Sequence, residues 1–595
     1  MQRKRLSTFL AIVMLLSLMA CNNTTPTTTT PASSTPASVP TVEATPPASE
    51  KVMRYADTQD IRNVNPHTGN YIAENNARVY LSGRLYRATI HPVTKTLLYL
   101  PEAAAELPIQ MDDAGSVWRV PLNPAMCWEN GELFTADTWM YTCERACDPV
   151  MVNPMGSWVF DNDVRILNGE EYYLSGEEGT SYTWEDVGVK KIDEQTIEFT
   201  LDGCYTQTEV IRHLSGVTPV YEPLYEAGMN AEHTSTTYAT SKDSFMASGP
   251  FVLESWEVDS ERVYRKNPLW PLADLINLDK MTYNIVPDYG TMMQLFEAGE
   301  LDWMDLDAVT FVRYEQDPRL LTFPSNQVGY FNINMGNPEN PLLSNANFRR
   351  AISWAIDREA MATIQLSSPW ASVIPGTAGG YDGIPYKDLP EVKAVYPENH
   401  GYNPDKAREY YDLALEELGL TSGSFEMVLN EGAEDRRKMV EYLHNSLPQI
   451  FGEDKMTITL HGLPAASASC LVLWNEGPTA YESGVSSWAW GSTLYYPNLQ
   501  FQFFTPSGQL NVTDYNCPEF DAMYVLSKTD EYRMNPKKLV ELTMEMEALM
   551  RDQVLVIPIT NFVGRAIISE RVLLPIEYDP ELGYATMFVD IDVTK

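Results

Sequence analysis

The length of the chain beyond its first fifty residues is the feature that most limits its fold. The chain has 595 residues, and a single hydrophobic core stops growing at about 250–300 residues, beyond which chains divide into separate units. Segments in which apolar residues alternate with polar ones are interspersed with segments of helical periodicity, a pattern typical of strands and helices that follow one another. The sequence therefore predicts an α/β protein with two large lobes, or with three domains.

The first twenty residues have the organisation of a secretory signal. Basic residues precede an apolar stretch over residues 6–19, which is shorter than the roughly 20 residues that a membrane-spanning helix needs. The run Leu18-Met19-Ala20-Cys21 resembles the bacterial lipobox, in which the cysteine is acylated and the signal is removed before it. We interpret residues 1–20 as a signal peptide and Cys21 as a lipidation site that anchors an extracytoplasmic protein to the cell membrane. A secreted protein with an incidental cysteine, or an uncleaved N-terminal anchor, is the alternative.

Residues 21–50 form a tether in this interpretation. After Cys21 they are almost all Thr, Pro, Ser, Ala and Val, and a segment of this composition cannot bury enough apolar surface to fold. The tether lifts the folded part off the membrane, which suits a protein that works beside a membrane partner.

Charge and composition exclude several classes of function. The net charge of −39 argues against binding to nucleic acid, which needs a basic surface. The histidines are scattered and no C-x-x-C pair occurs, so we expect no metal site and no cofactor. Six cysteines beyond Cys21 leave the disulfide pairing open, and they are Cys127, Cys143, Cys147, Cys204, Cys470 and Cys517.

The sequence lacks the short motifs of common enzyme classes. It contains no G-x-S-x-G elbow, no HExxH helix, no Walker loop and no G-x-G-x-x-G turn. We therefore predict that the protein is not an enzyme and name no catalytic residue. Among 81 acidic residues, a carboxylate pair of a surface glycoside hydrolase stays open as an alternative, and so does a receptor that presents its ligand to a membrane sensor.

The sequence predicts the starts of two helices. Thr135 is a good N-cap for a helix whose buried side carries Cys143 and Cys147. These two cysteines lie one turn apart, which suits a buried face better than a bridge between them. The second helix begins after Asn345 or Asn347, where apolar residues recur at core-facing spacing.

A series of short motifs occurs in one order across the folded part. One is the run Trp128-Glu129-Asn130-Gly131-Glu132-Leu133-Phe134-Thr135-Ala136-Asp137. The others are Pro101-Glu102-Ala103-Ala104-Ala105-Glu106, Trp118-Arg119-Val120-Pro121-Leu122, Ser248-Gly249-Pro250-Phe251, Arg265-Lys266-Asn267-Pro268 with Trp270, Ala298-Gly299-Glu300-Leu301-Asp302, Phe348-Arg349-Arg350-Ala351-Ile352 with Ala355-Ile356-Asp357-Arg358, Tyr402-Asn403-Pro404-Asp405-Lys406-Ala407 and Pro518-Glu519-Phe520-Asp521. In type and order the series resembles family 5 of the bacterial extracellular solute-binding proteins, which is the oligopeptide- and dipeptide-binding family.

Most of these motifs have a structural explanation before a functional one. Asn130-Gly131 is turn chemistry, and Gly249-Pro250 fixes a bend ahead of a strand. We expect Arg349 and Asp357-Arg358 to tie one helix to its surroundings rather than to touch a ligand.

The resemblance implies a two-lobed fold of the type II periplasmic-binding-protein kind, with a hinged cleft that encloses the ligand and a small domain added to the first lobe. The expected ranges are 51–90, 190–328 and 555–595 for the core of the first lobe, 91–189 for the small domain and 329–554 for the second lobe. The implied function is to capture a peptide or similar small solute as a monomer and to deliver it to the permease subunits and ATPases of an ABC-type importer.

The resemblance also places candidate ligand contacts in the first lobe. Asp60 lies in the loop after the first strand, where peptide binders of the family carry a ligand-facing acid. Met155 stands where they carry a ligand-facing aromatic, and Trp158 follows it closely. Methionine suits a pliable apolar wall.

The candidate contacts of the second lobe lie in residues 486–492. This run resembles a family segment that carries a ligand-facing tryptophan, which selects Trp488, Trp490 and Gly491. In oligopeptide binders an aspartate at the position of Gly491 pairs with the α-amino group of the ligand. The loss of this charge argues against recognition of a free N-terminus and leaves a blocked peptide, or another solute such as an oligosaccharide, as alternatives.

Overall fold

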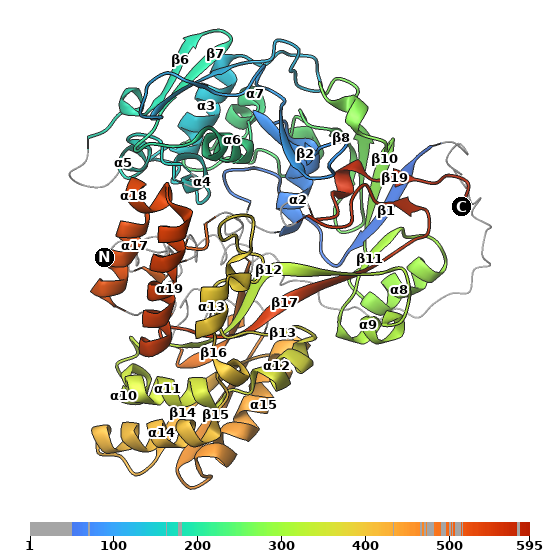
Figure 1. Cartoon of the computed structure of the whole chain (residues 1–595). Coiled ribbons are helices and arrows are strands. Elements are labelled where there is room, and N and C mark those ends of the chain that lie inside the picture. Colours follow the sequence, from blue (N-terminus) through green and yellow to red (C-terminus); the bar gives the residue numbers. More distant parts are fainter. Residues whose placement is uncertain are drawn as a thin grey trace.

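The structure is a computed structural model that describes residues 50–595 except 70–71, 162–163, 176–180, 432, 465–466, 469–471, 473–480, 490–495, 499–500, 502–503, 506–512, 514–515 and 580–582. Within these residues the protein is α/β and two-lobed, as predicted (Figure 1). We call the part with β1–β10 and α2–α7 the first lobe, and the part with β12–β17 and α10–α19 the second lobe.

Two four-stranded sheets and a hairpin form the first lobe. One sheet has the order β1 (Val52–Asp57), β10 (Lys280–Ile285), β9 (Glu261–Lys266) and β8 (Phe251–Glu257), with β1 parallel to β10. The other is antiparallel, in the order β4 (Ile109–Gln110), β5 (Val117–Pro121), β7 (Thr196–Thr200) and β6 (Val189–Asp193). This second sheet continues beyond the expected end of the small domain at residue 189. The hairpin pairs β2 (Tyr86–Ile90) with β3 (Leu97–Pro101).

The helices of the first lobe pack on one continuous apolar core, which also receives the C-terminal segment of the chain. They are α2 (Ile72–Leu81), α3 (Ala136–Ala146), α4 (Ser157–Phe160), α5 (Gly169–Tyr173), α6 (Gln207–Gly216) and α7 (Glu222–Ala227). In the C-terminal segment β18 (Val572–Leu573) pairs with β19 (Asp590–Ile591).

Two long strands connect the lobes. β12 (Leu320–Ile333) and β17 (Ile557–Ile568) run antiparallel, and β17 pairs at one end with β11 (Trp303–Asp305). In Figure 1 they extend from the neighbourhood of α8 (Tyr289–Glu297) and α9 (Ala308–Tyr314) into the second lobe. Their register shifts between Pro324 and Val328 and again between Gly329 and Tyr330. The expected lobe boundary between residues 328 and 329 therefore falls inside a continuous strand, next to these irregularities.

A seven-stranded sheet is the framework of the second lobe. Its order is β11, β17, β12, β16 (Ser483–Ala489), β14 (Gly423–Asn430) and β15 (Met456–Leu463), and β13 (Ser368–Pro369) also pairs with β17. Separate apolar cores include residues of α11, α14 and α15 and residues of α17 and α19. The helices are α10 (Pro341–Ser344), α11 (Ala346–Ala355), α12 (Arg358–Gln365), α13 (Pro390–Val395), α14 (Pro404–Leu418), α15 (Glu434–Phe451), α17 (Pro518–Ser527), α18 (Asp530–Arg533) and α19 (Pro536–Gln553).

Several motifs have the local roles that their residue types predict. Helix α3 starts directly after Thr135, and Asn345 rather than Asn347 caps α11 by accepting the backbone N–H of Phe348 at 3.0 Å. The Arg349 guanidinium is buried and donates to the backbone carbonyls of Ser344 at the end of α10 and of Gln553 at the end of α19. This arginine thus ties α11 to the end of α19.

Glu102 joins two of the motifs inside the first lobe. Its carboxylate is fully buried and accepts two hydrogen bonds from Arg87, both at 2.9 Å, and one from the indole Nε1 of Trp270 at 2.6 Å. Arg87 also donates to the backbone carbonyls of Val79 and Ser82 at the end of α2. The buried pair therefore holds the β2–β3 hairpin, α2 and the loop after β9 together.

Replacing Glu102 by glutamine should lower the free energy of unfolding by about 3–5 kcal/mol, because it leaves the buried Arg87 cation without its counter-charge. Chemical denaturation followed by fluorescence would measure the loss. The matched control is Glu441→Gln, which removes an exposed i,i+4 pair with Arg437 on α15 and should cost about 0.5 kcal/mol or less. Equal losses in the two variants would contradict the role of the buried pair.

Candidate ligand-binding site

Met155 and Trp158 lie in one turn at the start of α4. Trp158 donates its backbone N–H to the carbonyl of Met155 at 3.1 Å, and Met155 donates its own to the carbonyl of His67 at 3.1 Å. The Met155 side chain is buried, whereas Trp158 is 50% exposed. Of the two candidates, the tryptophan presents its apolar surface to solvent.

This turn lies on the side of the first lobe that meets the second lobe. Burial raises the pKa of the Tyr524 phenol on α17, and the charge of Asp161, directly after α4, raises it further. Asp161 belongs to the first lobe and Tyr524 to the second, so this electrostatic interaction acts between the lobes. Trp158, whose ring is exposed, stands two residues before α4 ends.

His67 holds the backbone of Met155, whose N–H its carbonyl accepts. Its ring is buried, and its Nδ1 lies 3.2 Å from the hydroxyl of Tyr225. Burial lowers the pKa of His67 to about 3, and the nearby charges of Arg145 and Arg78 add to the effect. The ring is therefore neutral in the folded protein at physiological pH.

The carboxylate of Asp60 binds other groups of the protein. Its carboxylate is 3% exposed and pairs with Arg262 at 3.1 Å. It also accepts hydrogen bonds from the indole of Trp256 and the backbone N–H of Asp259, both at 3.0 Å, and from Ile61 at 2.8 Å. These partners fix the loop after β1, while a contact of Asp60 with ligand stays a prediction.

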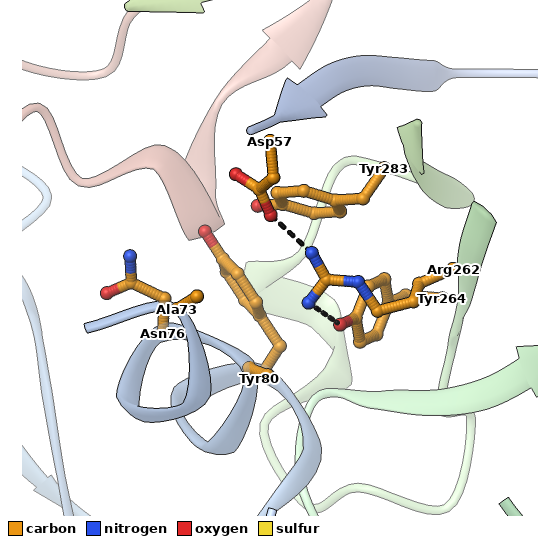
Figure 2. A pocket seen from close by; sticks show the side chains of 8 residues that line it. Asp57, Ala73, Asn76, Tyr80, Arg262, Tyr264 and Tyr283 are labelled. Carbon is orange, nitrogen blue, oxygen red and sulfur yellow. Dashed lines mark hydrogen bonds and ion pairs between the residues drawn. The ribbon is translucent and has the colours of Figure 1, made fainter. Parts of the chain in front are cut away.

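Figure 2 shows a small cavity beside this loop, between β1, α2, β9 and β10. Its volume is about 30 Å³, which is room for one water molecule rather than for a peptide. Arg262 donates to Asp57 and to the hydroxyl of Tyr264 at its edge. Burial raises the pKa of Asp57, and the charge of Arg262 opposes the rise.

A larger groove of about 750 Å³ lies elsewhere, along the C-terminal segment and the start of β12. Its lining consists of Lys95, Leu321, Leu574, Pro575, Ile576, Glu577, Tyr578 and Tyr584. Among the predicted contacts whose side chains the structure describes, which are Asp60, Met155 and Trp158, none lines this groove or the cavity of Figure 2.

Trp488 lies on β16, where its backbone pairs with Val328 of β12. The strand that carries it is therefore a direct neighbour of one of the two connecting strands. The preceding Ser486 is buried and accepts a hydrogen bond from Asn332 at 2.8 Å. The Trp488 side chain, Trp490 and Gly491 lie outside the described part of the structure.

The structure adds a contact between the lobes that the sequence analysis missed. Glu209 on α6 pairs with Arg533 on α18 and accepts a hydrogen bond from the hydroxyl of Tyr496 at 2.7 Å. The Glu209 and Arg533 side chains are 2% and 12% exposed. Thr206-x-x-Glu209 is a capping-box pattern that marks the start of α6, but nothing in it indicates a partner 324 residues away.

Metal-ligating clusters and membrane-spanning helices are absent from the described part of the chain. No group of His, Cys, Asp or Glu there could hold a metal ion, and no helix there has the length and apolar character needed to cross a membrane. The described cysteines are free, and they are Cys127, Cys143, Cys147, Cys204 and Cys517. Cys470 lies outside the described residues.

Residues 99–511 match the family model of the bacterial extracellular solute-binding proteins, family 5 Middle. The chain belongs to this family. The match spans both lobes and contains most of the motifs identified above, so the resemblance read from the sequence is confirmed.

Relatives of this solute-binding protein are distant in sequence. Oligopeptide-binding protein OppA of Bacillus subtilis (strain 168) is 22% identical over 364 residues, which cover 58% of this chain and 60% of that protein. The probable deoxycholate-binding periplasmic protein YgiS of Escherichia coli (strain K12) is 22% identical over 358 residues, or 58% of this chain and 61% of that protein. The chain thus spans about three fifths of the length of these two relatives.

A solved structure supports the fold. Listeria monocytogenes OppA bound to peptide superimposes with a TM-score of 0.71 at 20% identity, and the match covers 91% of this chain and 99% of that one. The shared architecture extends over both lobes of this solute-binding protein.

The buried His67 makes stability depend on pH. Its pKa is about 3 in the folded protein and near 6.5 in the unfolded chain. Between these values only the unfolded state binds the proton, so the contribution is fully present above pH 6.5 and is lost as the pH falls towards 3. We expect the free energy of unfolding to fall by about 2 kcal/mol more from pH 8 to pH 5 in the wild type than in His67→Gln. Denaturation curves of both proteins at the two pH values would measure this difference. An equal fall in the free energy of unfolding in the wild type and in His67→Gln would contradict the expectation.

Proposed function

We propose that this solute-binding protein captures a short peptide, or a similar small solute, between its two lobes and delivers it to the permease subunits of an ABC-type importer. The observation that carries the proposal is the pair of connecting strands in a member of this family, because lobes joined by two strands can close on a ligand by bending about them. The peptide-bound Listeria protein with the same architecture supports a peptide as ligand.

The ligand contacts we propose lie on both lobes. Trp158 offers an exposed ring at the start of α4, and Met155 in the same turn is buried. Trp488 and Trp490 follow from the family resemblance, and the backbone position of Trp488 next to β12 is compatible with a place near the hinge. Aromatic rings suit such a site because they contact varied ligands through large rigid surfaces.

Gly491 favours a ligand without a free amino terminus, because it supplies no charge where peptide binders carry an aspartate. A non-peptide solute is therefore the second candidate, and the similarity to a probable deoxycholate-binding protein supports it. Both candidates are bound and released unchanged, so we propose no catalytic step.

The protein works at the membrane in this proposal. The signal peptide and the lipobox-like Cys21 support export followed by lipid anchoring, and residues 22–50 supply the tether. A monomer held in this way stays within reach of the permease and its ATPases.

Native mass spectrometry of the protein as purified, and after mixing with a pool of short synthetic peptides, tests the ligand class. Half of the pool has free amino termini and half has acetylated ones. We expect one peptide per chain with preference for the acetylated half. Trp488→Ala or Trp490→Ala should weaken that binding by about 1–3 kcal/mol, whereas Trp354→Ala on helix α11 should leave it unchanged. Absence of any bound peptide, with bile acid or oligosaccharide bound instead, would exclude a peptide as ligand.

Replacing Cys21 by alanine should move the protein from the membrane to the soluble fraction, because the acyl anchor depends on that thiol. Detergent-phase partitioning of cells that express each version would measure the change. Cys517→Ala is the matched control, since it removes a cysteine of the folded part and should leave the distribution as in the wild type. Retention on the membrane of a Cys21 variant from which residues 1–20 have been cleaved would contradict lipidation at this position.

A further inference from the structure

The contact between Glu209 and Arg533 joins two separate hydrophobic cores. Helix α6 packs its apolar residues into the core of the first lobe. Helix α18 lies between α17 and α19, whose apolar residues pack into a core of the second lobe. Any opening of the lobes on this side must therefore separate Glu209 from Arg533.

Each oxygen of the Glu209 carboxylate has its own task. Oε2 accepts hydrogen bonds from the backbone N–H and the hydroxyl of Thr206, both at 2.7 Å, and so completes the cap of α6. Oε1 receives Arg533 and the hydroxyl of Tyr496 from the second lobe. The helix cap thus fixes the carboxylate in the orientation that the other lobe binds.

The partners from the second lobe are also held in place. Arg533 donates to Asp530 at 2.8 Å and stacks its guanidinium 4.1 Å from the ring centre of Tyr205. The Tyr496 ring lies 5.6 Å from the guanidinium of Arg212, which is on α6 like Glu209. Two cation–aromatic contacts therefore flank the ion pair, and both of them cross between the lobes.

The charge state of Glu209 suits its contacts with Arg533 and Tyr496. Burial by itself raises the pKa of Glu209, but the hydrogen bonds from Thr206 and the charge of Arg533 outweigh it, so the net pKa is lowered. Glu209 is therefore a carboxylate at physiological pH and remains a strong acceptor for Arg533 and Tyr496.

We propose that Glu209, Arg533 and Tyr496 form an interlobe latch whose residues position the two lobes for ligand capture without touching the ligand. This inference rests on the proposed function, because it takes closure of the lobes as part of capture. Every partner in the latch is a protein group, so its contribution to closure is the same whichever solute lies between the lobes.

The buried pair predicts a specific pattern among variants. In the open arrangement both charges regain water, whereas closure of Arg533→Met would bury the Glu209 carboxylate without a counter-charge. The single variants Arg533→Met and Glu209→Gln should therefore shift the lobes towards the open form. The double variant removes both charges and should close nearly as well as the wild type, since a buried pair and its uncharged replacement are often similar in net stability.

The test measures lobe separation and ligand release in the same set of proteins. Small-angle scattering of samples freed of ligand by unfolding and refolding gives the radius of gyration, and native mass spectrometry gives the release rate of peptides from the pool described above. We expect a larger radius and about tenfold or faster release for each single variant, and values within about threefold of the wild-type rate for the double variant. Arg437→Met, at the exposed pair on α15, is the matched control and should behave as the wild type.

Circular dichroism melting of each variant separates opening from misfolding, and the double variant keeps the test valid if one single variant folds poorly. Equal radii and equal release rates in all proteins would overturn the latch. Single variants that open without recovery in the double variant would overturn the ion pair as its cause. A wild type that binds no peptide of the pool, with single variants that still expand and a double variant that recovers, would overturn peptide capture and support the latch.

Discussion

The fold depends on one buried carboxylate at the junction of the lobes. Asp302 is fully buried, pairs with Arg54 of β1 at 2.8 Å and with Arg571 at 3.3 Å, and lies directly before β11. Its backbone N–H donates to the carbonyl of Arg54, and its carbonyl accepts the N–H of Ser569 at the end of β17. The first strand of the chain and the returning connecting strand are thus fixed at one point. The register shifts of the connecting strands lie further along β12 and β17, between this anchored end and the second lobe.

The sequence was most informative where chemistry is local. The sequence predicts Thr135 as one helix cap and Asn345 or Asn347 as another, because an N-cap acts on backbone groups within three residues, and the structure selects Asn345. The order of the motifs identified the family, and with it the two-lobed fold. The same motifs did not reveal what joins them: Glu102 and Trp270 both appear in the series, but their contact spans 168 residues and becomes visible only in the folded chain.

The site was harder to predict because a side chain's role depends on which partners the fold brings to it. Asp60 is acidic and close to β1, as expected, but Arg262 and the indole of Trp256 lie 3.1 and 3.0 Å away and occupy its carboxylate. Glu209 differs in the opposite way, because its sequence pattern predicts only a capping box. One of its carboxylate oxygens caps α6, and the other accepts a hydrogen bond from the second lobe. In both cases the sequence gives the chemical type, and distant segments of the chain decide its use.

Because the latch consists of protein groups, closure of the lobes and selection among ligands can depend on different residues. A ligand needs to supply only the part of the closing free energy that the lobes do not supply to each other. Contacts such as Glu209–Arg533 lower that requirement equally for every solute, so they raise affinity without selecting among ligands. Discrimination must then come from groups that touch the solute, and we propose that Gly491, which supplies no charge, acts at that level. A protein whose closure and selectivity depend on different residues can accept ligands of varied structure and still close in one geometry. Its own ion pair, rather than the bound ligand, then sets the geometry of closure.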